Sequence, residues 1–168
     1  MNISMKTEAM PREYKGTQML YVQSYLANII SAMFNARMSE MALNPECPYI
    51  QLGMNYGTYN VSKPVDATSV TAVAKEGKEK ETYATIIREL KRVKEYGFTG
   101  SEFARAKEEF LSQREKEYTN RDKRKHREYY QECVSHFLDG NAMPDAETEY
   151  QLWQAVAQQL NFDIVNAS

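Results

Sequence analysis

The segment "QMLYVQSYLANIISAMFNARMSEMA", residues 18–42, decides the fold because it carries a long amphipathic pattern. Its apolar residues recur at intervals of three and four, which places them in one stripe along an α-helix. Thr17 is placed to cap the start of this helix, and "NPECP" ends it. We therefore expect one long helix with a buried face formed by Val22, Leu26, Ile29, Ile30, Met33, Phe34, Met38 and Met41.

Three shorter segments around this helix show the alternation that is typical of β-strands. "NISMKT" begins at residue 2, "YIQLGMNYGTY" at residue 49 and "TSVTAVAKEG" at residue 68. The second has one apolar face and one small or polar face, where Gly53 and Gly57 indicate a bulge or a close backbone approach. We expect the second and third strands to form an antiparallel hairpin, with a turn region at "NVSKPVDA".

Helices follow in the rest of the chain. An apolar stripe over residues 83–93 precedes Gly97, and "TGSE" at residues 99–102 fits a capping box. Further stripes cover residues 103–111, 129–138 and 150–160. The order strand, helix, strand, strand and then mostly helix predicts an α+β fold, a small antiparallel sheet with helices on one face. Residues 1–168 are expected to form one domain whose sheet is incomplete.

The composition is that of an ordinary globular protein. The chain has 168 residues, of which 42% are hydrophobic and 26% charged, and a formal net charge of -2. This balance gives no global field that would attract nucleic acid or an anionic membrane. No apolar run approaches the roughly 18 residues of a membrane span. Cys47 and Cys133 are expected to be two packed thiols, with a single disulfide as the alternative.

The chain contains no recognisable catalytic motif. His126 and His136 are its two histidines, and neither belongs to an H-E-x-x-H or H-x-x-E-H sequence. We therefore expect no catalytic metal and no cofactor in this chain. A Cys133–His136 nucleophile pair has the right sequence proximity, but Cys133 lies on an apolar stripe, where a thiol is usually inert.

The basic segment "RDKRKHR", residues 121–127, is the strongest charge feature. One interpretation is a helix face that grips an anionic partner, which would make the chain a stand-alone binding module. The other, which we favour, is a solvated helix face balanced by neighbouring acids. The residues concerned are Arg121, Lys123, Arg124, Lys125 and Arg127.

Five strings occur in order along the chain: "MFNARMSEMA", "PYIQLGMNYGTY", "VTAVAKEGK", "RVKEYGFTGSEFARAKEEFL" and "HFLDG". Together they resemble the pitrilysin/insulinase-type zinc metallopeptidases, in particular bacterial four-domain members. The resemblance implies a metallohydrolase-like fold, similar to a domain of mitochondrial processing peptidase. It also implies the non-catalytic domain that follows the H-x-x-E-H domain, with zinc held by that other domain.

The resemblance further implies that the partners are the other domains of the same polypeptide and the peptide substrate of the parent enzyme. A periplasmic or cell-envelope location in a Gram-negative bacterium is the corresponding expectation. In many members an arginine and a tyrosine reach the substrate at the zinc site. Tyr49 could match that tyrosine, but the arginine's place near Leu43 and Asn44 holds no basic residue. We therefore expect at most a chamber contact from Tyr49.

Arg37 and Glu40 are unusual because they interrupt an apolar helical pattern. At about 100° per residue, Arg37 falls within the stripe and Glu40 lies on the same side three residues later. A buried arginine needs a partner, so the simplest prediction is an internal Arg37–Glu40 ion pair. The alternatives are bonds from Arg37 to carbonyl groups near Tyr49, or a contact with substrate. Asn35 is predicted to point the opposite way.

Overall fold

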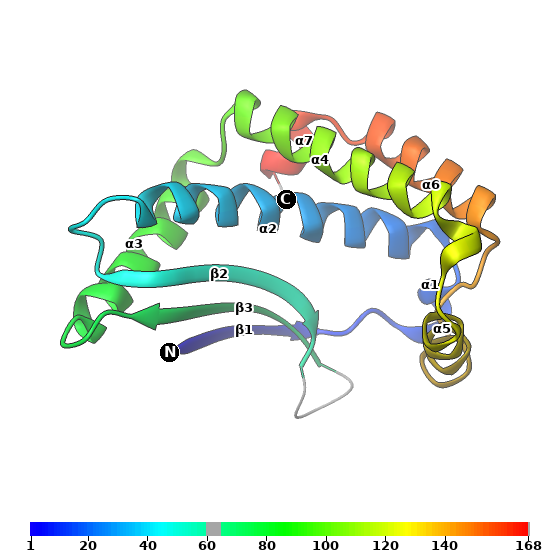
Figure 1. Cartoon of the computed structure of the whole chain (residues 1–168), viewed down its shortest axis with the longest axis horizontal. Coiled ribbons are helices and arrows are strands. Elements are labelled where there is room, and N and C mark those ends of the chain that lie inside the picture. The colour runs from blue at the N-terminus through cyan, green and yellow to red at the C-terminus, as the bar shows by residue number, and fades with distance from the viewer. Residues whose placement is uncertain (60–64, 168) are drawn as a thin grey trace.

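The computed structural model of the chain describes residues 1–59 and 65–167 (Figure 1). Residues 60–64 of the expected turn "NVSKPVDA" lie outside that part. The elements follow the predicted order, and the α+β prediction is confirmed. They are β1 (Asn2–Glu8), α1 (Arg12–Lys15), α2 (Gln18–Ala42), β2 (Tyr49–Thr58), β3 (Val65–Ala74), α3 (Glu79–Tyr96), α4 (Gly100–Thr119), a 3-10 turn (Arg121–Lys123), α5 (His126–Asp139), α6 (Ala146–Gln159) and α7 (Phe162–Ala167).

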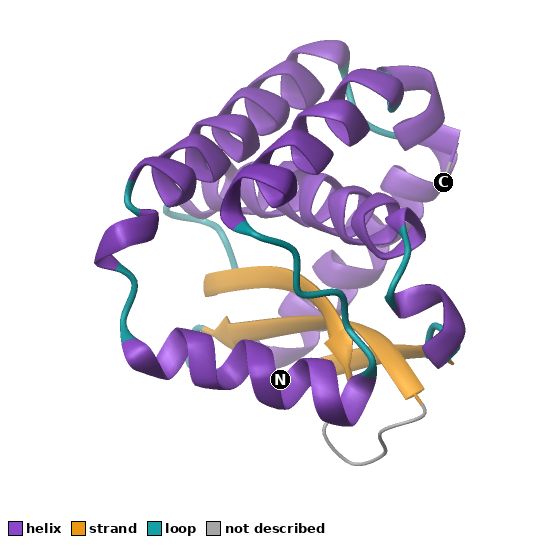
Figure 2. Cartoon of the chain, turned by 90° about the vertical axis from the view of Figure 1, so that its right-hand side faces the viewer, coloured by secondary structure: helices purple, strands orange, loops and turns teal. Residues whose placement is uncertain are grey.

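The sheet has three antiparallel strands in the order β1-β3-β2. The predicted β2–β3 hairpin is confirmed, and β2 is an edge strand. Leu52 and Met54 share one buried face with Val70 and Ala72 of β3. The opposite face of β2 carries the small and polar residues Gln51, Gly53, Asn55 and Gly57, as predicted, but at the irregular start of the strand Tyr49 is buried and Ile50 is exposed. Figures 1 and 2 show α2, α4 and α6 as a layer on one side of the sheet, with α5 apart from it.

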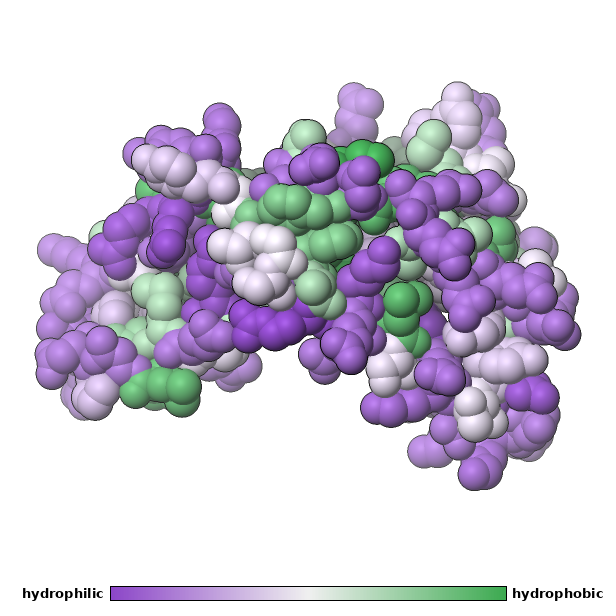
Figure 3. All heavy atoms as spheres, turned by 90° about the horizontal axis from the view of Figure 1, so that it is seen from above, coloured by the Kyte–Doolittle hydropathy of each residue, from purple (hydrophilic) through white to green (hydrophobic). Residues whose placement is uncertain are grey.

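Helix α2 lies between β2 and the pair α4 and α6, and it supplies most of the core. Its buried residues include Tyr21 and Tyr25, which the sequence pattern did not count as apolar. The Tyr25 ring meets Phe110 of α4 edge-on at 5.1 Å, and Phe110 meets Trp153 of α6 at 5.3 Å. The buried stripe therefore begins one position earlier than predicted. From above, the helix layer is mostly hydrophilic with an apolar patch near its middle (Figure 3).

The caps predicted at Thr17 and at Thr99–Glu102 are present. The Thr17 hydroxyl accepts a hydrogen bond from the Met19 N–H at 3.2 Å at the start of α2. Thr99 and Glu102 form a full capping box on α4. Gly140, with φ of 77°, ends α5 in the left-handed conformation that favours glycine. Local sequence therefore fixes where these helices begin and end.

Helix α5 departs from the prediction. It buries none of its residues, and its apolar stripe stays open, with Phe137 77% and Tyr130 68% exposed. The basic segment 121–127 does not lie on a helix face either, because the chain leaves α4 at Asn120 through a 3-10 turn and re-enters helix only at His126. The stripe over residues 129–138 was expected to pack, and residues 121–127 were expected to form a solvated helix face.

Candidate functional site

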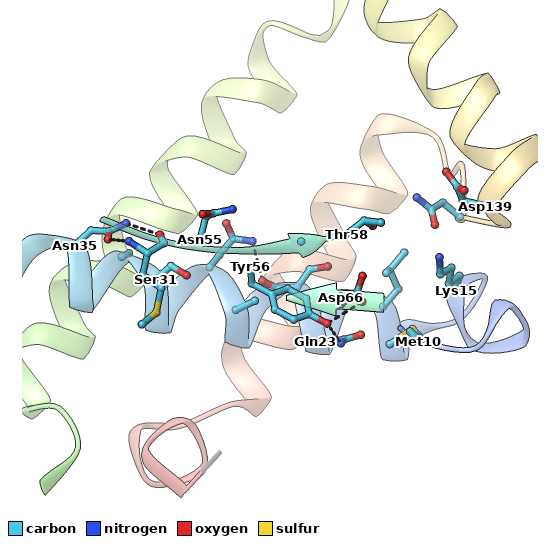
Figure 4. A pocket seen from close by; sticks show the side chains of 18 residues that line it. Met10, Lys15, Gln23, Ser31, Asn35, Asn55, Tyr56, Thr58, Asp66 and Asp139 are labelled. Atoms are coloured by element: carbon cyan, nitrogen blue, oxygen red, sulfur yellow. Dashed lines mark hydrogen bonds between the residues drawn. The ribbon is translucent and has the colours of Figure 1, made fainter. Parts of the chain in front are cut away.

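A groove of about 530 Å³ lies between α2 and the outer edge of β2 (Figure 4). One wall is a stripe of α2 that runs from Leu20 to Asn35. The other is the second half of β2, from Met54 to Thr58. Four residues at one end of the groove come from the segment around α1 and from the end of α5, namely Met10, Lys15, Asp139 and Asn141.

The α2 wall leaves room for a ligand because its side chains are short. Ser24, Ala27, Asn28 and Ser31 follow one another at helical spacing and all line the groove. They lie beside the buried stripe of the same helix, so they are not needed to fill the core. The Asn28 amide donates a hydrogen bond within its own helix, to the Ser24 carbonyl at 2.7 Å.

The β2 wall presents backbone hydrogen-bonding groups. In an antiparallel pair, alternate residues bond to the partner strand while the residues between them point away from it. The Tyr59 N–H bonds the Val65 carbonyl at 2.8 Å, which fixes that alternation for β2. The N–H and C=O groups of Met54, Tyr56 and Thr58 therefore point outward, away from β3. Within residues 1–59 and 65–167, no hydrogen bond reaches these groups on Tyr56 or Thr58.

Asn35 closes the inner end of this open edge (Figure 4). Its Oδ1 accepts a hydrogen bond from the Met54 N–H at 2.6 Å, and its Nδ2 donates to the Met54 carbonyl at 3.0 Å. Gly53 lies beside this contact, where a Cβ would sit 3.5 Å from Asn35 Oδ1. A close approach near a glycine was predicted, whereas the irregularity in pairing falls between Tyr49 and Gln51. Asn35 was predicted only to point away from Arg37.

Tyr56 is held firmly in the groove. Its hydroxyl donates to Asp66 Oδ2 at 2.9 Å and accepts from Gln23 Nε2 at 2.6 Å (Figure 4). Burial, followed by the hydrogen bond to Asp66, raises the pKa of Tyr56 to about 12. The phenol therefore stays neutral near pH 7 and links α2 to both hairpin strands.

Arg37 forms an ion pair, but the predicted partner is wrong. Its Nε and Nη2 donate to the two carboxylate oxygens of Glu102, each at 2.9 Å, and its guanidinium lies 4.9 Å from the Phe98 ring centre. Glu40 is exposed and lies 3.6 Å from Arg105 instead. The buried stripe includes the tyrosines of α2, so Arg37 lies at its rim and faces the start of α4. There a carboxylate can meet both arms of the guanidinium.

Burial alone would raise the pKa of Glu102, but it is outweighed by hydrogen bonds from Arg37 and Thr99 and by the charge of Arg37. The result is a pKa of about 2. Glu102 therefore serves two purposes, because the same carboxylate also receives the Thr99 N–H of the capping box at 2.7 Å. The pair joins α2 to the first turn of α4.

The structure does not support Tyr49 as a chamber contact. Its side chain is 1% exposed, and its hydroxyl donates to the Met38 carbonyl at 2.8 Å. Burial, with a smaller contribution from the nearby Cys47, raises the pKa of Tyr49 well above its usual value. The residue therefore fixes the start of β2 against α2 and does not reach the surface.

Two residues of the basic segment, Arg121 and Arg124, have partners within the chain. Arg121 donates to the Tyr118 carbonyl at 3.0 Å and lies over the Tyr118 ring. Arg124 pairs with Glu128 at 3.6 Å and with Glu132. Three of the five predicted residues remain exposed and without an ion pair in the described part of the chain: Lys123, Lys125 and Arg127. This arrangement gives no continuous cationic surface.

The thiols and histidines do not form a reactive centre. Both cysteines are free, so there is no disulfide; Cys47 is buried as predicted, but Cys133 is exposed. His136 Nδ1 donates to the Asn141 carbonyl at 2.7 Å, whereas Cys133 Sγ lies 4.0 Å from Met143 Sδ. Over the two described ranges, no three His, Cys, Asp or Glu side chains gather closely enough to hold a metal ion. No helix found there is long and apolar enough to cross a membrane.

Comparison with known proteins shows the fold. No family model and no curated protein sequence matches the chain. Among solved structures, the periplasmic protease PqqL from Escherichia coli matches 99% of this chain with a TM-score of 0.83 and 15% identity. A predicted insulinase family protease from Yersinia pestis matches 99% of it with a TM-score of 0.81 and 13% identity.

The chain corresponds to only part of each of these proteins. It covers 18% of PqqL, and 34% of the structure of the first half of PqqL, to which it is 14% identical with a TM-score of 0.79. It covers 35% of the Yersinia pestis protein. The chain therefore has the architecture of one domain of larger proteases in which that domain is joined to others.

Proposed function

We propose that this chain is a non-catalytic domain of a larger insulinase-type zinc protease and that its groove holds an extended segment of peptide substrate. The observation that carries the proposal is the open backbone edge of β2 at Tyr56 and Thr58, which lies beside a groove with short side chains on its far wall. The shared fold with PqqL and the ordered sequence strings support the family.

Strand addition is the physical basis of this proposal. An extended peptide binds an exposed sheet edge through backbone hydrogen bonds, and pockets for alternate side chains add selectivity. Tyr56 and Thr58 each offer one donor and one acceptor, so a peptide can make four such bonds here. These bonds do not depend on sequence, which suits a domain that presents varied substrates to a catalytic centre elsewhere.

We propose that binding and hydrolysis are divided between two domains. The chain supplies the edge and the groove, while hydrolysis belongs to a separate domain with H-x-x-E-H and zinc. Its partners are then the other domains of the same polypeptide and the peptide substrate. A periplasmic location, as in PqqL, is part of this proposal. The alternative, a module that binds an anionic partner, loses support because Arg121 and Arg124 are engaged within the chain.

Nuclear magnetic resonance titration tests the proposal. The probe is the capped, uncharged peptide Thr-Val-Thr-Val-Thr, chosen because β-branched residues favour the extended state. We expect saturable shifts at the Tyr56 and Thr58 amides that change little with salt. Ser31→Leu should abolish them by filling the groove, whereas Ser39→Leu, on the same helix outside the groove, should not. Shifts confined to other surfaces would contradict the proposal.

Metal analysis and a cleavage assay test the non-catalytic part. We expect less than stoichiometric zinc in the purified chain and no cleavage of an unstructured peptide. One tightly held zinc per chain, with matching peptidase activity, would refute this part. Sequencing the parent gene upstream of Met1 for H-x-x-E-H is an independent check.

A further inference from the structure

The Asn35 side chain makes the same two hydrogen bonds to the Met54 backbone that a neighbouring strand would make. In a paired sheet, a residue of the next strand offers an acceptor to the N–H and a donor to the C=O of the residue opposite it. The Asn35 carboxamide does both, at 2.6 Å and 3.0 Å. The edge of β2 is therefore already satisfied at Met54, while two residues further on, at Tyr56, it is open.

We infer that Asn35 is a positioning residue that sets the register of a bound peptide. The inference rests on the proposed peptide-binding role of the groove. A strand that docks on β2 can pair with Tyr56 and Thr58, and the Asn35 side chain occupies the place of its next pairing residue. The bound segment must therefore end, or turn away from β2, before it reaches Met54.

The hydrogen bonds gained and lost at Met54 explain why a bound peptide does not displace Asn35. A peptide residue that displaces Asn35 forms two bonds with Met54, but it breaks two existing ones and leaves the Asn35 amide without them. Displacing Asn35 therefore adds little to the free energy of peptide binding, because one set of hydrogen bonds only replaces another. Pairing at Tyr56 and Thr58 breaks no such bond within the described residues. A register that uses only these two residues is consequently favoured over one that extends to Met54.

The shape of the groove also directs the bound peptide toward Asn35. Ser31, one helical turn before Asn35, lines the same wall of α2, so the two side chains lie along one path (Figure 4). Successive pairing residues of a strand lie about 6.6 Å apart, since each residue rises about 3.3 Å. A strand that pairs at Tyr56 therefore brings its next pairing residue directly to Asn35.

Scanning the peptide with single N-methyl groups tests the register, because N-methylation removes one backbone donor. In the unmodified chain we expect affinity for the Thr-Val-Thr-Val-Thr probe to fall at least tenfold at two peptide positions, two residues apart. In Asn35→Ala a third sensitive position should appear two residues further along, and the peptide should slow hydrogen exchange of the Met54 amide. Asn120→Ala, at an asparagine outside the groove, is the control and should keep two positions.

The possible outcomes separate the two proposals. If the unmodified chain binds no peptide at the groove, the proposed function fails. If it binds with two sensitive positions and Asn35→Ala shows the same two, the groove binds peptide but Asn35 does not set its register, and this inference is overturned. Should Asn35→Ala lose the fold, Asn35→Ser gives the same test, because serine is too short to bridge both groups of Met54.

Discussion

The bidentate pair between Arg37 and Glu102 makes stability depend on pH in a way that one substitution can isolate. A change in the Glu102 pKa from 4.5 to about 2 corresponds to about 3 kcal/mol of stability at neutral pH. The two side chains are 12% and 14% exposed, so solvent screens part of this energy. We therefore expect Glu102→Gln to lower the free energy of unfolding by about 2 kcal/mol at pH 7.

The sign of the pH effect follows from the lowered pKa. The contribution is fully present above the unfolded-state value of 4.5 and is lost as the pH falls toward 2. Urea unfolding should therefore show the gap between the unmodified chain and Glu102→Gln narrowing by about 1 kcal/mol between pH 7 and about pH 3.5. Glu40→Gln is the control and should change stability by less than about 0.5 kcal/mol. A gap that does not vary with pH, or an equal loss from Glu40→Gln, would refute the reasoning.

Substitutions at Arg37, Asn166 and Tyr25 give three further tests. Arg37→Met should cost about 1 kcal/mol less than Arg37→Ala in urea unfolding, because methionine keeps the packing that alanine loses; equal losses would contradict this. Asn166→Ala should lower the free energy of unfolding by about 1–2 kcal/mol, since its amide bonds both the N–H and the C=O of Phe98; an unchanged melting temperature would argue against it. Tyr25→Phe should stabilise the chain by up to about 1 kcal/mol, because the buried Tyr25 hydroxyl has no hydrogen-bond partner among the described residues; a clear loss would show that the hydroxyl is bonded.

Local sequence signals were enough to predict most of the architecture. The long helix was placed at residues 18–42, where α2 lies. The Thr17 cap and the Thr99–Glu102 capping box were also predicted, and both are present. These signals succeed because a cap involves residues two or three apart, so the chemistry that fixes the helix end is contained in a short string.

Contacts between distant segments could not be predicted in the same way. Arg37 and Glu102 are separated by 65 residues, and the helical pattern of α2 alone offered only Glu40 as a partner. Tyr21 and Tyr25 were left out of the stripe because tyrosine is amphipathic, although both are buried here. Without these two tyrosines, the predicted buried face of α2 was rotated from the observed one. Arg37 was therefore predicted within the buried face, whereas it lies at its rim.

The groove was missed for a related reason. Ser24, Asn28, Ser31 and Asn35 look like the solvent side of an amphipathic helix, and nothing in their spacing identifies a wall. Only the strand order shows that β2 is an edge strand and that α2 runs beside it. Gly53 was the available signal, since a glycine within a strand indicates close approach. Gly53 does lie next to Asn35, but a Cβ there would make only an ordinary contact with Asn35 Oδ1, so the glycine did not identify the groove.

The short open edge of β2 also favours the proposed peptide over a second sheet as the occupant of the groove. An exposed strand edge is a site where chains pair and aggregate unless the protein restricts it. Here α2 stands beside β2 along the groove, so a second sheet with its own covering helices meets α2 before it reaches the edge. Asn35 satisfies the edge at Met54, and Tyr56 and Thr58 follow it along the groove with no hydrogen bond to their outward groups from the described residues. A single extended chain is narrow enough to reach them, and this geometric restriction favours strand addition by a peptide over edge-to-edge association.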